Sequence, residues 1–393
     1  MTYRSKVAWI FLLGFALDLV NMFVATVAYP DIARELHASV TQLAWISNAY
    51  MLGLTLIIPF SVWLAAILGE RALIAASLLV FAGASIMVGQ ASSIDALIGW
   101  RALQGLGGGL LIPVGQAMAY RQFPPTERSQ LTARVMSVAL LVPALSPALG
   151  GLVVDTVSWR WIFYANLPLA LGTLALALLW IKPDGPANGR PTLDVASIFK
   201  QVRSPMLRVA MLVYLCIPGI FIGTSLIAIL YLRDTGYDAA HTGALMLPWA
   251  LASALAIYLS KQLFNRYGPK PLLLAGMALQ CIGILLLNTD LIIPAYLLMG
   301  LGGSLCSSTA QTLAFLDIPA ERMGHASALW NINRQISFCL GAALLSALLS
   351  ALDSFAITFT MAAALTLLPV FAVLRLDTSR VRTLLHPASE ARR

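Results

Sequence analysis

The residues of this sequence most able to do chemistry are a few ionisable and amide side chains inside long apolar stretches. Asp18 is the only acidic residue well inside one of them. A charged carboxylate there is costly unless it is hydrated, paired or protonated. Because apolar surroundings favour the protonated carboxyl group, proton exchange moves toward physiological pH, and Asp18 is a candidate proton carrier. The alternative is a structural carboxyl group that hydrogen-bonds a neighbouring helix.

A second candidate is Arg101, which shares one helical face with Gln104, Gly105 and Gly108. A guanidinium group keeps its charge at physiological pH, so at that depth it must have partners. The glycines allow another helix to approach closely. Two roles stay open: Arg101 interacts with a carboxylate or a substrate, or it braces the helix by donating to backbone carbonyl groups.

A third polar group lies near the end of the chain, where Asn331, Arg334 and Gln335 share a helical face. Such a set of donors favours an anionic or polyhydroxylated substrate. The same side chains could instead serve only to pair helices through hydrogen bonds.

The composition shows what must position these groups. Apolar residues make up 59% of the chain and charged residues 11%, against about 45–50% and about 25% in soluble globular proteins. The mean hydropathy of +0.83 over 393 residues excludes a single membrane anchor. Four cysteines in apolar runs show no metal-ligand spacing, so we expect no metal site and no disulfide framework.

Twelve apolar stretches reach the length of about 20 residues that a membrane-spanning helix needs. A span must satisfy its own backbone hydrogen bonds, so all twelve should be helical. The expected spans are 7–29, 43–66, 72–90, 94–118, 131–154, 160–181, 207–232, 241–264, 270–288, 291–316, 324–350 and 355–374. The sequence thus predicts an all-α membrane protein in contact with the lipid bilayer.

The basic residues set the expected orientation. With both termini in the cytoplasm, most lysines and arginines fall on the cytoplasmic side, as the positive-inside rule requires. The net charge of +8 therefore needs no nucleic-acid partner.

A repeat divides the chain into halves. The run from Gly105 to Gln116 recurs from Gly300 to Gln311, 195 positions later, and two further matches lie at nearly the same offset. A segment rich in proline and glycine separates the copies. We expect an N-terminal six-helix bundle at 1–181, a cytoplasmic linker with one short helix at 182–206, and a C-terminal six-helix bundle with a short tail at 207–393. Two similar bundles around a midplane site are typical of alternating-access transporters.

The motifs resemble those of the major facilitator superfamily, and within it the drug:proton antiporters. The fourth span reads Leu97-x3-Arg101-x2-Gln104-Gly105-x-Gly107-Gly108-Gly109, which is similar to that superfamily's fourth-helix motif. The fifth span, with Pro147, Gly150 and Gly151, resembles the antiporter motif, and Trp159-Arg160-Trp161 follows it. The resemblance implies twelve helices in two pseudo-symmetric six-helix bundles, and a monomer in a bacterial inner membrane. It also implies that Arg101 modulates the protonation of a carboxylate and that the fifth-span motif seals the cavity.

Two departures from that pattern are expected to matter. The loop after the second span, which holds Gly69 and Arg71, has Ala66 and Ile67 where the resemblance implies a gating Asp and Arg. The first-helix motif is shifted and places Asn21 at the Asp position, with Asp18 one turn earlier. The second-half copy of the loop keeps more of the gate motif, in Asn265, Arg266 and Gly268.

These observations predict a secondary transporter that exports small organic solutes, as in drug or multidrug efflux. Protons would couple transport through Asp18 and Arg101, while Asn21, Gln104, Asn331, Arg334 and Gln335 would line the substrate cavity. The driving force would be the proton motive force, with no cofactor. A dedicated metabolite or siderophore exporter and a proton-symporting importer stay open. An enzyme is disfavoured, because phosphate-loop, zinc-protease and nucleophile-elbow motifs are missing from the sequence.

Overall fold

The computed structural model describes residues 1–184, 193–236 and 245–385, and every regular element in those ranges is a helix. The chain forms two compact units. The first unit comprises Met1–Gln122, Val138–Lys200 and Ala320–Ile332; the second comprises Phe123–Ser137, Gln201–Pro319 and Asn333–Arg393. The expected boundaries at residues 181 and 207 stay predictions.

Two long helices contribute a segment to each unit. They are α8 (Arg128–Thr156) and α18 (Met323–Leu352). Both occupy equivalent places in the sequence repeat, each following a glycine-rich helix.

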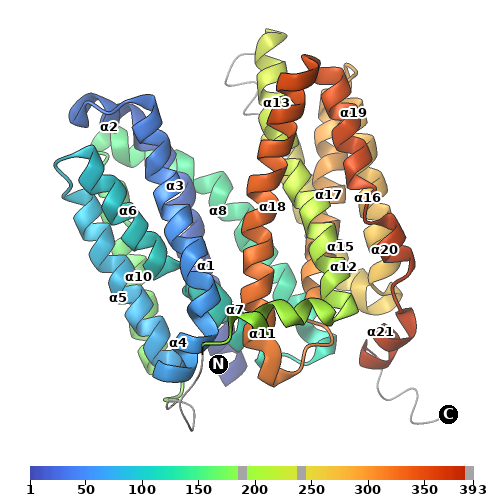
Figure 1. The fold of residues 1–393 in the computed structure, drawn as a ribbon, viewed down its shortest axis with the longest axis horizontal. Helices are drawn as coiled ribbons and strands as arrows, with labels where there is room; N and C mark the ends of the chain where they lie inside the picture. The colour runs from blue at the N-terminus through green and yellow to red at the C-terminus, as the bar shows by residue number, and fades with distance from the viewer. Residues whose placement is uncertain (185–192, 237–244, 386–393) are drawn as a thin grey trace. The chain divides into compact units, whose positions relative to one another are not determined.

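The first unit is built on a group of antiparallel helices. Helix α6 packs against α3 and α5, and α1 packs against α7 and α10 (Figure 1). The α-helices of this unit are α1 (Tyr3–Val24), α2 (Tyr29–Leu36), α3 (Val40–Ile57), α4 (Ser61–Leu68), α5 (Glu70–Gly89), α6 (Ile94–Gly108), α7 (Leu111–Gln122), α9 (Trp161–Tyr164), α10 (Asn166–Trp180) and α11 (Val195–Lys200). Short 3-10 turns are η1 (Ala25–Ala28), η2 (Ile58–Phe60) and η6 (Ala320–Arg322). Helix α11 is the short helix expected in the linker, whose residues 185–192 lie outside the described ranges.

The second unit repeats this packing, with α17 against both α15 and α16 (Figure 1). Its α-helices are α12 (Pro205–Tyr214), α13 (Ile220–Asp234), α15 (Met246–Tyr267), α16 (Pro269–Leu286), α17 (Ile292–Ala314), α19 (Phe355–Thr366), α20 (Val370–Leu374) and α21 (Thr378–Leu385). The 3-10 turns η3 (Pro125–Glu127) and η4 (Gln201–Arg203) and the π-helix η5 (Leu215–Gly219) complete it.

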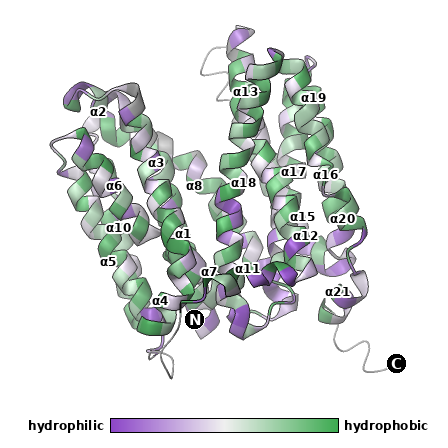
Figure 2. Cartoon of the chain, in the orientation of Figure 1, coloured by the Kyte–Doolittle hydropathy of each residue, from purple (hydrophilic) through white to green (hydrophobic). Residues whose placement is uncertain are grey.

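Nine helical segments in the described ranges are long and apolar enough to cross a membrane. They coincide with nine of the twelve expected spans. The other three expected spans are occupied by α6 with α7, by α8, and by α15. Apolar residues dominate the shafts of the helices, and a hydrophilic stretch interrupts α18 (Figure 2).

The repeat is visible in how the glycines pack. A Cβ atom added to Gly105 would lie 2.0 Å from the carbonyl oxygen of Tyr50, and one added to Gly300 would lie 2.4 Å from that of Trp249. In each unit a glycine therefore brings two helices into backbone contact. This equivalence matches Tyr50 with Trp249. It also matches Arg101 with Tyr296, since each lies four residues before its glycine.

Helix α12 continues into α13 through the π-helix η5, which contains Pro218. Proline has no N–H to donate and clashes with the preceding turn, so the hydrogen-bond ladder widens there. Gly219, the last residue of η5, lies against α18: a Cβ atom added to Gly341 of α18 would lie 1.9 Å from the Gly219 carbonyl oxygen. The bulge in α12–α13 thus packs directly on the backbone of α18.

Candidate functional site

Asp18 lies on α1, buried at 3% exposure in the first unit. Its carboxylate accepts a hydrogen bond from the hydroxyl of Tyr50 on α3. The Asp18 charge also acts electrostatically on Arg101 of α6. The one acidic residue that the sequence placed deep in a span therefore lies beside the arginine of the fourth-span motif.

Arg101 is fully buried and donates hydrogen bonds to α3, to α1 and to its own helix, α6. Its Nε donates to the carbonyl oxygen of Ile46 (3.1 Å), and Nη1 donates to Asn21 Oδ1 (3.0 Å) and to Gln104 Oε1 (2.6 Å). Its Cζ atom lies 4.5 Å from the centre of the Tyr50 ring, a cation–π contact. Within the described part of the chain, Nη2 has no hydrogen-bond partner. The side chain both braces α3 and carries its charge into the polar group on α1.

Gln104 and Asn21 extend this network to further helices. Gln104 Nε2 donates to Ser85 Oγ on α5 (2.7 Å), and Ser85 Oγ donates to the carbonyl oxygen of Phe81 (2.8 Å). Asn21 Oδ1 also accepts from Asn166 Nδ2 on α10 (3.2 Å). Five helices, α1, α3, α5, α6 and α10, meet in one buried polar cluster.

The arrangement can hold and release a proton. Asp18 supplies a carboxyl group, and the Arg101 charge and the Tyr50 hydroxyl group lie beside it. Tyr50 was not among the expected site residues. Its signal in the sequence was Gly53, which lies three residues later on the same face of α3 and packs with its Cβ position 2.2 Å from the carbonyl oxygen of Ala102.

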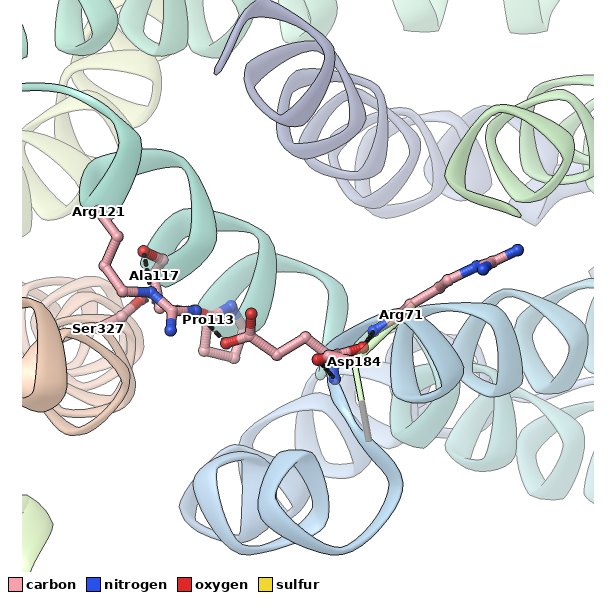
Figure 3. A network of polar contacts seen from close by, with 7 residues as sticks. Arg71, Pro113, Ala117, Arg121, Asp184 and Ser327 are labelled. Atoms are coloured by element: carbon pink, nitrogen blue, oxygen red, sulfur yellow. Dashed lines mark hydrogen bonds and ion pairs between the residues drawn. The ribbon is translucent and has the colours of Figure 1, made fainter. Parts of the chain in front are cut away.

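Asn331 is held within the first unit by α7 rather than lying open. Asn331 Nδ2 donates to Gln116 Oε1 (2.7 Å), and Ser327 Oγ donates to the same oxygen (2.8 Å) and to the carbonyl oxygen of Pro113 (2.8 Å). Pro113 and Ser327 lie close together in Figure 3. The structure thus places Asn331 in a helix-pairing contact, which is one of the two roles that its sequence allowed.

Arg334 and Gln335 belong to the second unit and are buried. The guanidinium group of Arg334 lies close enough to Tyr214 of α12 to interact with it electrostatically. Tyr214 in turn packs against Phe338, with ring centres 6.1 Å apart. A cation, a phenol and an aromatic ring are therefore neighbours on α12 and α18.

The fifth-span motif lies in α8. A Cβ atom on Gly150 would lie 2.4 Å from Cγ2 of Val24, at the end of α1, and one on Gly151 would lie 3.6 Å from Val27. Gly150 thus permits α8 to approach α1 closely. Pro147 lies in the same helix.

The turn between α4 and α5 is organised by a carboxylate that sequence reasoning missed. Gly69 has φ +82°, and the Asp184 carboxylate accepts from the backbone N–H groups of Glu70 (2.5 Å) and Arg71 (3.1 Å). Arg71 Nη2 donates to the carbonyl oxygen of Leu178 (2.6 Å). Figure 3 shows Asp184 beside Arg71. Asp184 caps α5 from a distant segment, so no local spacing could reveal it.

The same turn carries an ion pair. Glu70 bonds Arg121 at the end of α7, and both side chains are largely covered. The resemblance implied an acidic and a basic gating residue at Ala66 and Ile67. A carboxylate and a guanidinium group are still present at this end of the unit: Glu70 lies four residues after Ala66, and Arg121 comes from α7.

The second-half copy of the turn is simpler. Gly268 has φ +78° and directly precedes α16, and the Arg266 guanidinium group lies 5.1 Å from the centre of the Tyr267 ring. Asn265 Nδ2 donates to the carbonyl oxygen of Thr126 (2.6 Å). The positive φ at Gly69 and Gly268 explains why glycine occupies both positions.

At the opposite end of the first unit, Glu35 accepts from Trp159 Nε1 and from Arg160 Nη1, each at 2.6 Å. These hydrogen bonds hold the pKa of Glu35 below its ordinary value. A depression of about 400 Å³ lies beside them and is lined by Asp31 and Glu35 among others. The depression opens to the surface, and Asp18 is not among its lining residues. It is therefore a separate feature from the buried cluster around Asp18.

The fold and these sites define a polytopic helical membrane protein with duplicated halves and a buried acid–arginine cluster. The Major Facilitator Superfamily profile matches residues 11–342. The chain belongs to that superfamily, which confirms the expected fold class and makes the protein a transporter of small molecules rather than an enzyme.

Individual proteins agree with this assignment. MdtD of Cronobacter sakazakii is 27% identical over 87% of this chain and 86% of its own length. The multidrug resistance protein Stp of Mycobacterium tuberculosis is 26% identical over 86% of this chain and 74% of its own. The solved human organic anion transporter MFSD10 superposes with a TM-score of 0.78 at 16% identity, covering 95% of this chain and 100% of that one. This last likeness concerns the fold alone.

Proposed function

We propose that this transporter exports small organic solutes by alternating access, as in multidrug efflux, in exchange for protons carried by Asp18. The observation that carries the proposal is the burial of Asp18 in a cluster with Arg101 and Tyr50. The similarity to Stp, which is named a multidrug resistance protein, supports the choice of solutes. The close contact of Gly150 with Val24, within a motif that resembles that of antiporters, supports export.

The driving force follows from the charge that moves. A proton that crosses a potential of about 100 mV supplies roughly 2.3 kcal/mol. That free energy sustains about a fifty-fold gradient of a neutral solute per proton. No cofactor is needed for this cycle.

The proposal includes the setting of the protein. The chain is a multi-pass membrane protein; we place it as a monomer in a bacterial inner membrane, with both termini in the cytoplasm. Fusing a reporter enzyme that is active only outside the cytoplasm after Asn288, and separately at the C-terminus, tests the orientation. Activity is expected for the first fusion and not for the second.

The main experiment measures the collapse of a pH gradient in energised inverted vesicles when a solute is added. The solutes are ethidium, norfloxacin, a hydroxamate siderophore and xylose. The native chain is compared with Asp18→Asn, and with Asp95→Asn as a matched control because Asp95 is an exposed acid at the start of α6. We expect a response to ethidium or norfloxacin that Asp18→Asn loses and Asp95→Asn keeps.

Other outcomes separate the alternatives. A response confined to the siderophore or to xylose would point to a dedicated exporter. Solute uptake with protons in right-side-out vesicles would indicate an importer. An equal response in the native chain and Asp18→Asn would remove Asp18 from the coupling mechanism.

A further inference from the structure

Tyr50 is in contact with both charged members of the buried cluster. Its hydroxyl group donates to the carboxylate of Asp18, and its ring lies under the guanidinium group of Arg101 with Cζ at 4.5 Å from the ring centre. The side chain is buried at 1% exposure. Tyr50 on α3 therefore links the carboxylate of Asp18 on α1 to the guanidinium group of Arg101 on α6.

Two glycines of α6 set the position of this ring. A Cβ atom on Gly105 would lie 2.0 Å from the Tyr50 carbonyl oxygen, and one on Gly108 would lie 3.1 Å from the Tyr50 hydroxyl oxygen. The backbone of α3 is thus fixed against α6. The hydroxyl group rests on a turn of α6 where a side chain would displace it.

We propose that Tyr50 is the positioning residue that orients the Asp18 carboxyl group for proton binding. The inference deepens the proposed function and rests on it for its role in transport. A hydroxyl group that donates to a carboxylate fixes the orientation of that carboxylate, and the contact of the Tyr50 ring with Arg101 fixes the hydroxyl group in turn. The incoming proton bonds to an Asp18 carboxylate oxygen, while Tyr50 keeps its own O–H bond and turns from donor to acceptor.

Other titratable side chains lie near Asp18 in the described part of the chain. Arg101 faces it from α6 and Tyr50 from α3, and the nearby Tyr29 also acts on the charge of Arg101. Helices α7 and α10 pack along α1, and α8 touches the end of α1 where Gly150 meets Val24. The charged residues of α8 are Arg128 and Arg134 in its first two turns and Asp155 in its last turn. Helix α10 carries no titratable residue, and those of α7, Tyr120 and Arg121, lie at the far end of that helix, beyond the contact of Gly115 with Phe11.

The second half of the chain shows that this arrangement is specific to the first. Packing matches Tyr50 with Trp249 and Arg101 with Tyr296. Neither replacement reproduces the pair of a phenol and a guanidinium group. Trp249 instead stacks on Phe221, with ring centres 5.1 Å apart at an angle of 9°. At these two matched positions, the second half therefore does not repeat the phenol–guanidinium pair of the first half.

The test measures protonation directly, with no transported solute. Infrared difference spectra of the purified native protein follow the carbonyl stretch of the protonated carboxyl group as the pH is changed. Asp18→Asn identifies the band. Tyr50→Phe is expected to move this band to a higher frequency, because the carboxyl group loses its hydrogen-bond partner. Tyr296→Phe, a second buried tyrosine, should leave it at the native value.

Gly108→Ala provides a second route if Tyr50→Phe does not fold, because the added methyl group displaces the hydroxyl group without removing it. It should move the band as well. A native band position in the folded variants would overturn the inference, whatever the transport assay shows. A shifted band with no proton-coupled transport would instead uphold the role of Tyr50 and contradict the proposed function.

Discussion

Ser327 Oγ donates a 2.8 Å hydrogen bond to Gln116 Oε1, which joins α18 of the second half of the sequence to α7 of the first. Asn331 donates to the same oxygen. All three side chains are buried and belong to the first compact unit. The amide oxygen of Gln116, in the first half of the sequence, therefore accepts two hydrogen bonds from side chains of the second half.

Gln116→Leu should destabilise the protein, because it leaves the amide of Asn331 and the hydroxyl of Ser327 with one acceptor fewer each. We expect the free energy of unfolding to fall by about 1–2 kcal/mol, given that buried interhelical hydrogen bonds in membrane proteins are each modest. Denaturant unfolding in detergent measures it. Gln122→Leu, an exposed glutamine on the same helix, is the control and should change little. Equal stability of the native chain and Gln116→Leu would contradict the prediction.

Much of the fold could be predicted because its physics is local to the chain. Apolar length defines a span, and a glycine-rich helix that recurs 195 residues later reveals the duplication. The pairing of Arg101 with Gln104 follows from their spacing, since residues three apart share a helical face. The functional roles assigned to these residues stay predictions.

Other features depend on contacts between distant segments, and spacing alone cannot disclose them. Asp184 caps α5 from a loop more than a hundred residues later. Tyr50 of α3 reaches Asp18 of α1 where Gly105 also brings α6 against the backbone of α3. The sequence of α18 fits a cavity-facing Asn331 equally well, and only its acceptor on α7, Gln116, shows that it pairs two helices. In each case the partner is set by helix packing, which a single sequence does not specify.

Glu35 should make stability depend on pH in the acidic range. Its folded pKa lies below the ordinary value because Trp159 and Arg160 donate hydrogen bonds to the ionised form. The resulting stabilisation is present above the unfolded pKa of about 4.3 and is lost as the pH falls through the folded value. The Glu35 side chain is half exposed, so the contribution should stay below about 1 kcal/mol.

The measurement compares thermal unfolding at neutral pH and at about pH 4. Glu35→Gln should lower the unfolding temperature at neutral pH and flatten its dependence on pH below the ordinary glutamate range. Glu321→Gln, an exposed glutamate at the start of another helix, should do neither. A native pH profile in Glu35→Gln would show that the contacts with Trp159 and Arg160 carry no net stabilisation.

Exchanging the charges of Glu70 and Arg121 should test their ion pair without removing it. Glu70→Arg places two cations together at largely covered positions and should cost about 1 kcal/mol or more. The double variant Glu70→Arg with Arg121→Glu restores opposite charges and should recover most of that loss. Thermal unfolding measures both. If the double variant is no more stable than Glu70→Arg, the pairing does not hold this end of α5 to α7.

Gly341→Ala should be the most damaging of these substitutions, since its Cβ atom would lie 1.9 Å from the carbonyl oxygen of Gly219. Neither backbone can yield easily: Gly219 belongs to the π-helix of Pro218, and α18 is continuous through Gly341. Forcing the helices apart should cost about 1–3 kcal/mol. Gly172→Ala, where nothing lies within 4 Å, should instead stabilise α10 by up to about 1 kcal/mol. Unfolding temperatures in detergent that move in opposite directions would show that the loss at Gly341 comes from helix contact and not from replacing a glycine as such.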